Sequence, residues 1–198
     1  MKALSLAISL LAAAPLAAQE FPSLFDVAGV AANDVLNLRE SPSAQAPIVG
    51  TLAPGATAVE VVGADPSGRW GLVNTGETAG WAALAYLRQQ HGSEDLAGHA
   101  LTCGGTEPFW SLRITQGTGA HFNPMEGGAE DWPAGTLAPG GGRSDRFLIG
   151  LGEGRAAVLS RGLCSDGMSD RMFGLEINLV SHPGGLTLWN GCCSIAPR

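Results

Sequence analysis

Short apolar runs separated by glycine and proline turns dominate this chain and restrict it to a β fold. The 198 residues include 29 glycines and 12 prolines, and both residue types interrupt helices. Between the turns, apolar and polar residues alternate, as in residues 110–115 and 175–179, which is the period of a half-buried strand. A hydrophobic content of 45% is too high for a disordered chain. The predicted fold class is therefore all-β.

Residues 1–18 have the features of a secretory signal peptide. A positive charge at Lys2 precedes a short apolar run that ends in small residues. We therefore predict cleavage between Ala18 and Gln19. The run is short and contains Pro15, so it is a poor membrane span, and it is not followed by the cysteine that a lipid anchor would need. These features predict a periplasmic or secreted protein with no transmembrane segment after cleavage.

The net charge of the chain disfavours nucleic acid as a partner. The formal charge at neutral pH is -7, and removal of the only lysine with the signal peptide makes the mature chain more negative. A surface of this sign repels the phosphates of nucleic acids and of anionic lipids. We therefore expect no nucleic-acid partner.

Residues 24–88 carry a series of short strand patterns separated by tight turns. Runs rich in β-branched residues, such as residues 58–62, are typical of strands. Turn pairs such as Pro54-Gly55 and Thr75-Gly76 lie between the runs. Many short strands in one small unit predict a barrel.

Four motifs follow one another in this unit. They are Leu36-Asn37-Leu38-Arg39, Val49-Gly50-Thr51-Leu52, Gly80-Trp81 and Tyr86-Leu87. In this order they resemble the bacterial SH3 family, and the resemblance covers residues 24–88. It implies an SH3-like barrel. In exported proteins it further implies contact with cell-wall peptide or glycan, or with envelope proteins, as a binding or adaptor module.

Two polar and two aromatic residues are the framework candidates of this unit. Asn37 and Arg39 lie on the opposite strand face from their leucine neighbours, because side chains alternate along a strand. We interpret them as residues that fix the following loop by hydrogen bonds. Trp70 and Trp81 are predicted to be core residues, since a domain this small needs its aromatic side chains to fill its barrel. A polyproline-binding groove needs several exposed aromatic residues and is therefore not expected.

The remainder of the chain divides into a linker and a second β unit. Residues 89–98 are polar and show no apolar periodicity, so we predict a linker. Residues 99–198 contain alternating strand patterns with turns such as His182-Pro183-Gly184-Gly185. They predict a disulfide-bonded β-meander or a second small barrel. The chain is thus expected to form two small all-β domains.

The cysteines Cys103, Cys164, Cys192 and Cys193 all lie in the second unit. An even number in an oxidising compartment indicates disulfides. No C-x-x-C pair occurs in the sequence, which disfavours a zinc ribbon or a thioredoxin-like site. Neighbouring residues of a strand point to opposite faces, so Cys192 and Cys193 take different partners. The residues therefore predict that Cys164 pairs with one of these two and Cys103 with the other.

Three boxes of the second unit occur in a fixed order. They are Gly105-Thr106-Glu107-Pro108-Phe109-Trp110, Cys164-Ser165-Asp166-Gly167-Met168-Ser169-Asp170-Arg171 and Gly191-Cys192. They resemble a domain of unknown function that occurs in bacterial envelope proteins and lipoproteins. The chain departs from that pattern at Met172-Phe173, where a tyrosine-proline pair is usual. The resemblance implies that Cys164–Cys192 is the disulfide of the family and that Cys103–Cys193 is an addition in this chain.

The boxes contain the candidate functional residues of the second unit, which are Glu107, Trp110, Asp166, Ser169, Asp170 and Arg171. Paired carboxylates divide the work of acid and base when their environments differ. Aspartate and serine are also common in turns, where their side chains bond the local backbone. We favour the structural role, because a disulfide at Cys164 needs a rigid turn beside it.

No catalytic, metal or cofactor site is predicted from the sequence. The four histidines, His91, His99, His121 and His182, are scattered and lack the i,i+4 spacing of metal ligands. A cysteine nucleophile at the adjacent pair would need a histidine and a polar partner downstream, and neither follows it.

Two hypotheses of different class follow. In the first, the protein is an exported, non-catalytic envelope protein that contacts peptidoglycan or envelope proteins through its SH3-like unit. In the alternative, the second unit is an envelope hydrolase or a small-ligand-binding domain with Glu107, Asp166 and Asp170 in one site. Convergence of the three carboxylates in a pocket beside Trp110 would favour the alternative. Wide separation, or positions at solvated turns, would favour the first.

Overall fold

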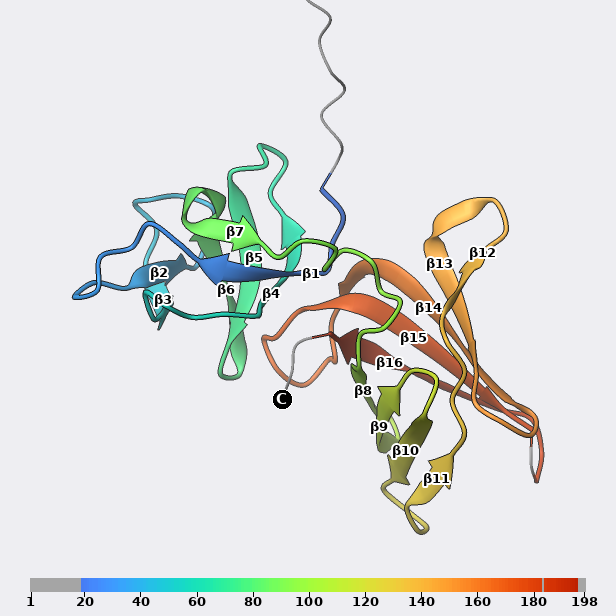
Figure 1. Cartoon of the computed structure of the whole chain (residues 1–198). Coiled ribbons are helices and arrows are strands. Elements are labelled where there is room, and N and C mark those ends of the chain that lie inside the picture. Colours follow the sequence, from blue (N-terminus) through green and yellow to red (C-terminus); the bar gives the residue numbers. More distant parts are fainter. Residues whose placement is uncertain (1–18, 183, 196–198) are drawn as a thin grey trace, which may run out of the picture.

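The structure, a computed structural model, describes residues 19–182 and 184–195. These residues form two antiparallel sheets of seven and nine strands (Figure 1). The predicted all-β fold class is confirmed. The predicted signal peptide lies outside the described residues. In the described part of the chain, no helix has the length and apolar character needed to cross a membrane.

The seven-stranded sheet is built by the first half of the chain and has the order β3-β2-β6-β5-β4-β1-β7. Its strands are β1 (Ser23–Val27), β2 (Leu36–Arg39), β3 (Ile48–Leu52), β4 (Val59–Ala64), β5 (Trp70–Thr75), β6 (Thr78–Ala83) and β7 (Leu87–Gln89), and the short 3-10 helix η1 (Leu84–Tyr86) precedes β7. The sheet encloses a core of buried apolar side chains that includes Phe25, Leu38, Val61 and Ala82. This is the first of the two small β units that the sequence predicts.

A glycine allows three strands of this sheet to pack closely. A Cβ atom at Gly80 would lie 2.9 Å from the Cβ atom of Leu38 and 2.9 Å from a methyl carbon of Val49. Both distances are too short for carbon atoms in contact, so glycine lets β6 approach β2 and β3. The next residue, Trp81, pairs with Arg39 across the ladder between β2 and β6.

The nine-stranded sheet has the order β11-β10-β9-β8-β16-β15-β14-β13-β12. Its strands are β8 (Leu101–Thr106), β9 (Phe109–Thr115), β10 (Gly119–Pro124), β11 (Glu130–Trp132), β12 (Ala138–Gly140), β13 (Arg143–Gly150), β14 (Arg155–Cys164), β15 (Phe173–Ser181) and β16 (Thr187–Ser194). Residues 133–137 connect the two edge strands. Within them, the carbonyl oxygen of Gly135 accepts from the backbone N of Gly117 at 2.8 Å, and its N donates to the oxygen of Gly150 at 3.0 Å. The segment thus ties opposite ends of the sheet together around the core.

Strand β9 shows how the sequence pattern builds this core. Trp110, Leu112 and Ile114 are buried, and the residues between them are exposed, as the period of the sequence predicts. Burial of an aliphatic side chain such as Leu112 contributes about 2 kcal/mol. Trp110 also begins an aromatic cluster, in which the ring centroids of Trp110 and Phe122 lie 6.0 Å apart and those of Phe122 and Trp132 lie 4.7 Å apart. Apolar side chains therefore fill the core that the nine-stranded sheet encloses.

Residues 89–98, predicted to form a linker, contact both sheets. Leu96 is fully buried within the core of the nine-stranded sheet. The hydroxyl of Ser93 accepts a hydrogen bond from the backbone N of Leu24 and donates to its carbonyl oxygen, both at 3.1 Å. Because Leu24 belongs to β1, the segment holds the two sheets together by side-chain packing as well as by its backbone. The domain boundaries themselves stay a prediction.

A buried carboxylate joins the two sheets directly. Glu60 lies in β4 of the seven-stranded sheet and is buried. Its carboxylate accepts hydrogen bonds from the Ser194 hydroxyl and from the backbone N of Ile195, the latter at 2.9 Å. Charge-assisted hydrogen bonds of this kind are among the stronger ones in proteins. They hold the end of β16 against β4.

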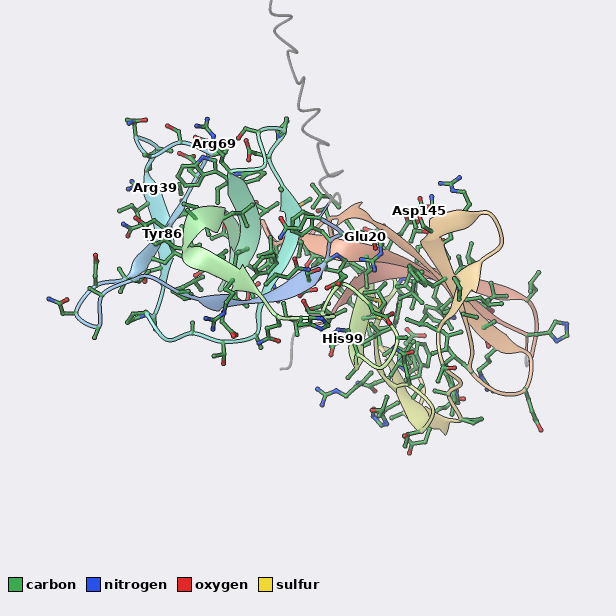
Figure 2. The ribbon with its side chains drawn as sticks, turned by 45° about the horizontal axis from the view of Figure 1, so that its top comes forward. Glu20, Arg39, Arg69, Tyr86, His99 and Asp145 are labelled. Atoms are coloured by element: carbon green, nitrogen blue, oxygen red, sulfur yellow. A yellow bond between two sulfur atoms is a disulfide. The ribbon has the colours of Figure 1, made fainter. Side chains whose placement is uncertain are left out.

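The residues before β1 form a second connection between the sheets. Arg161, in β14, donates to the carbonyl oxygens of Phe21 and Glu94, and its guanidinium lies 3.6 Å from the carboxylate of Glu20. Figure 2 shows Glu20 between the two lobes. One side chain of the nine-stranded sheet therefore binds the segments on both sides of the first unit.

Candidate functional site

A groove on the seven-stranded sheet is the candidate functional site. It consists of two adjoining hollows of about 450 Å³ and about 630 Å³, and Ala44, Trp70 and Ala83 line both of them. The remaining walls come from residues 29–31, 34–37, 42–45, 68–69 and 84–86 and from Arg39. We call it the Trp70 groove.

A tight turn before β5 sets the position of Trp70. One carboxylate oxygen of Asp65 accepts hydrogen bonds from the backbone N of Arg69 at 2.9 Å and from that of Trp70 at 2.8 Å. The other oxygen accepts from the hydroxyl and the backbone N of Ser67. These bonds, led by that of the Ser67 hydroxyl, lower the pKa of Asp65 to about 2. Asp65 is therefore charged at neutral pH, and the turn presents Arg69 and Trp70 to the groove.

Arg39 both braces a loop and lines the groove. Its Nη1 atom donates to the carbonyl oxygen of Ala46 at 2.8 Å, which holds the loop after β2 against the sheet. The side chain is half-buried and lines the smaller hollow together with Asn37. The sequence predicts only the bracing role for these two residues. Nothing in the pattern of β2 indicates which distant loops face them.

Trp70 is not the core residue that the sequence predicts. It is half-buried and lines both hollows, because it occupies the first position of β5 at the rim of the sheet. Trp81 is also half-buried, and Tyr86 is 45% exposed and lines the smaller hollow. The groove therefore offers the ring surfaces of Trp70 and Tyr86 to a ligand.

The charged residues that line the groove have a positive balance. They are Asp34, Arg39 and Arg69, on a chain whose formal charge is -7. Figure 2 shows Arg39, Arg69 and Tyr86 gathered on the lobe of the seven-stranded sheet. A guanidinium binds a carboxylate through two parallel N–H···O bonds. The groove is therefore suited to an extended chain that carries carboxylates.

The structure brings only two of the three candidate carboxylates together. Glu107 and Asp166 line one hollow of about 330 Å³, where the three boxes of the second unit meet. Asp170 does not line this hollow. Its backbone N donates to the oxygen of Glu77, and its oxygen accepts from the N of Ala79, both at 3.0 Å. The three-carboxylate site of the enzymatic alternative is therefore not formed.

Asp166 caps a turn. Its Oδ1 atom accepts from the backbone N of Met168 at 3.0 Å and from that of Ser169 at 2.9 Å, and Oδ2 accepts from the Ser169 hydroxyl at 2.8 Å. Partial burial raises the pKa of Asp166, but the hydrogen bonds from Ser169 and Met168 outweigh it and the net pKa is lowered. A carboxyl group held in its charged form is a poor proton donor. Because the Ser169 hydroxyl donates to Asp166, both side chains serve the turn.

The glycines of the boxes serve packing around Trp110. A Cβ atom at Gly105 would lie 2.2 Å from Nε1 of Trp110, and one at Gly191 would lie 2.2 Å from the carbonyl oxygen of Gly104. Strands β8 and β16 therefore close tightly over the buried indole. Arg171 lies over an aromatic ring of β15, with its Cζ atom 5.2 Å from the ring centroid. These box residues have structural partners.

The cysteines form two disulfides, Cys164–Cys192 and Cys103–Cys193. This is the pairing that the family resemblance of the boxes implies. Cys103 and Cys193 face each other across the ladder between β8 and β16, and both are buried. Cys164 is half-buried and lines the same hollow as Asp166.

The histidines do not gather at a metal centre. Within residues 19–182 and 184–195, no three histidine, cysteine or carboxylate side chains come close enough to hold a metal ion. The ring of His121 bonds the carboxylate of Asp131 at 2.8 Å on an exposed face.

Comparison with known proteins identifies the first unit. Residues 34–88 match the family model of the bacterial SH3 domain. The match begins before β2 and ends within β7, and it includes Arg39, Arg69, Trp70 and Tyr86 of the groove. These residues form a bacterial SH3 domain, the family that the motifs of this unit resemble. No curated protein and no solved structure matches the chain.

Proposed function

We propose that this protein is an exported envelope protein that binds peptide chains of the cell wall through the Trp70 groove. Bacterial SH3 domains bind cell-wall components, and residues 34–88 form such a domain. The observation that carries the proposal is the groove, in which two aromatic rings and two arginines line two adjoining hollows. The two disulfides and the signal-like N-terminus support a location outside the cytoplasm.

The chemistry of the groove favours peptide over glycan. Arg69 is exposed beside Trp70, so a ligand that reaches the indole also reaches a guanidinium. The peptides that cross-link a bacterial wall are short and carry free carboxylates, which arginine binds bidentately. Arg39 and Arg69 also offset the negative charge of the chain at the groove. The apolar parts of the peptide's side chains pack against Trp70 and Tyr86.

The nine-stranded sheet leaves the groove open. Strands β5 and β6 form a hairpin in which Trp70 pairs with Ala83 at one end and Thr75 pairs with Thr78 at the other. The second sheet contacts the Thr78 end, through a bridge to Asp170. The groove lies at the opposite end of the same hairpin. We therefore propose that the second domain acts as a support that holds the SH3 domain with its groove exposed.

The enzymatic alternative has less support. Asp166 caps a turn, and Asp170 lies with its backbone against the SH3 domain. Of the three candidates this leaves Glu107, which is exposed between β8 and β9 and lines its hollow together with the likewise exposed Glu176. Acid–base work needs two groups held in different environments around one reacting atom. We therefore propose a non-catalytic role for the second domain.

The test is a sedimentation assay of the mature protein with purified sacculi. The groove variants are Trp70→Ala and Arg69→Ala, and the matched control is Arg113→Ala, which removes an exposed arginine of β9. Loss of a central aromatic anchor typically costs about 2 kcal/mol or more, so we expect about 30-fold weaker binding for Trp70→Ala. The control should bind as the unaltered protein does. Equal retention of Trp70→Ala, Arg69→Ala and the unaltered protein would contradict the proposal, as would no retention of the unaltered protein.

Amidation of the sacculi separates peptide carboxylates from glycan as the ligand. Conversion of the peptide carboxylates to amides removes the charge that the two arginines pair with, so binding should fall. The remaining binding should also lose most of its dependence on salt concentration. Unchanged binding to amidated sacculi would show that the groove does not recognise the carboxylates.

A further inference from the structure

The loop between β14 and β15 docks onto the tip of the β5–β6 hairpin. Its backbone forms a parallel bridge there, in which the N of Ala79 donates to the oxygen of Asp170 at 3.0 Å. Beyond the bridge, the Asn74 side chain donates to the carbonyl oxygen of Met172 at 2.7 Å and accepts from its backbone N at 3.0 Å. We call residues 165–172 the docking loop. It contacts both arms of the hairpin.

The Cys164–Cys192 disulfide attaches the docking loop to its own sheet. Cys164 is the last residue of β14, directly before the loop, and Cys192 lies in β16. The ladder between β14 and β15 changes register between Arg161 and Cys164, and it ends at the pair of Cys164 and Phe173 that flanks the loop. Within the loop, the Thr106 hydroxyl donates to the carbonyl oxygen of Asp166 at 2.9 Å. The disulfide is the covalent part of this attachment.

The two disulfides differ in their exposure to solvent. Cys103 and Cys193 are 3% and 0% exposed. Cys164 is half-buried and lines the open hollow of about 330 Å³ that it shares with Asp166, whereas its partner Cys192 is 3% exposed. Cleavage of a disulfide by a thiolate needs access to one of its sulfur atoms. The hollow therefore gives a small dithiol a route to Cys164. Cys103 lines a smaller hollow of about 210 Å³ but is almost fully buried, and Cys193 is enclosed in the core.

We propose that the Cys164–Cys192 disulfide is a redox-controlled latch for the docking of the two domains. A thiolate of a dithiol reductant attacks the sulfur of Cys164, and Cys192 leaves as a thiolate and takes up a proton. The second thiol of the reductant then displaces Cys164, so the protein gains two electrons and two protons and the reductant becomes a disulfide. The released docking loop no longer holds the hairpin tip. The contacts of Glu60 with Ser194 remain, so the domains loosen without separating.

The β5–β6 hairpin connects this latch to the Trp70 groove. The docking loop contacts one end of the hairpin, and Trp70 lies at the other end. Reduction should therefore weaken ligand binding in the groove, a consequence that rests on the proposed function. The docking does not rest on it and is measured without any ligand.

The test combines graded reduction with alkylation and hydrogen exchange. The disulfide-bonded mature protein is treated with increasing dithiothreitol, alkylated in a short pulse and mapped by mass spectrometry. We expect Cys164 and Cys192 to react at reductant concentrations about tenfold or more below those needed for Cys103 and Cys193. At the concentration that opens only the Cys164–Cys192 disulfide, amide exchange in residues 74–79 should rise. Earlier or simultaneous alkylation of Cys103 and Cys193, or unchanged exchange in residues 74–79, would overturn the proposal.

A single substitution tests the latch with both disulfides intact. Asn74→Ala removes the side chain that binds Met172, so exchange at the hairpin tip should rise without reductant. Subsequent reduction of Cys164–Cys192 should add little, because both changes release the same contact. Asn33→Ala, at an exposed asparagine of the same domain, is the matched control and should exchange as the unaltered protein does. Full additivity of substitution and reduction would show that the disulfide does not act through this contact.

Discussion

Removal of the buried disulfide, by Cys103→Ser with Cys193→Ser, should destabilise the protein more than removal of the other one. The buried bridge joins residues 90 positions apart, and Cys164–Cys192 joins residues 28 positions apart. In the chain-entropy account, closed loops of about 90 and about 28 residues contribute about 4.6 and about 3.6 kcal/mol. The shorter loop lies inside the longer one and reduces its effective length to about 60 residues, which lowers the larger value to about 4.3 kcal/mol. Serine at both buried positions adds the cost of burying hydroxyl groups.

Denaturation in guanidinium, followed by tryptophan fluorescence without reductant, gives the free energy of unfolding. We expect a loss of about 4–5 kcal/mol for the Cys103 and Cys193 double substitution. The loss for Cys164→Ser with Cys192→Ser should be about 3–4 kcal/mol. Equal losses, or a larger loss for the Cys164 and Cys192 double substitution, would contradict a dependence of the stabilisation on loop length and burial.

Three further predictions concern packing, titration and the segment between the sheets. Gly191→Ala would place a Cβ atom 2.2 Å from a backbone oxygen, so thermal unfolding should show a loss of stability of about 1–3 kcal/mol or more. Gly128→Ala, where the added Cβ atom meets open space, should change the stability little. Equal melting temperatures of the two variants would contradict this prediction. The pKa of Asp65 is about 2 in the folded protein against an ordinary 3.8. Its hydrogen bonds therefore stabilise the turn above pH 3.8 and are lost as the pH falls through 2. A titration midpoint of the Asp65 carboxyl near 3.8, measured by NMR, would refute this prediction. Leu96→Ala should lower the free energy of unfolding by about 2–5 kcal/mol, because the side chain is fully buried. His91→Ala, at an exposed residue of the same segment, should lower it little. An unchanged free energy of unfolding for Leu96→Ala would indicate a flexible linker.

Features with a local physical cause could be predicted from the sequence. The alternation of Trp110, Leu112 and Ile114 indicates a strand with one buried face, because side chains of a strand alternate between its faces. The run 36–39 and Gly80-Trp81 carry the resemblance to bacterial SH3 domains, and the match of residues 34–88 supports it. These patterns depend on neighbours in the chain, so a single sequence contains them.

Features that depend on distant residues could not be predicted. Trp70 looks like a core residue, but its place at the rim follows from loops that come together only in the fold. Leu96 is the single large apolar residue in a polar segment, and its burial depends on the second sheet. Asp170 contacts the hairpin through its backbone, and backbone contacts have no side-chain signature. Asn74 and Met172 are 98 positions apart, and the local sequence around each residue does not indicate the other.

Binding of wall peptide in the Trp70 groove is measured most directly by an NMR titration of the isotope-labelled mature protein with a soluble peptide fragment of the cell wall. We expect shift changes in residues 29–31, 34–37, 68–70 and 84–86, which line the Trp70 groove. The same titration of Trp70→Ala should show these changes only at much higher peptide concentration. No shift changes at high peptide concentration, or changes confined to the nine-stranded sheet, would contradict peptide binding in the groove.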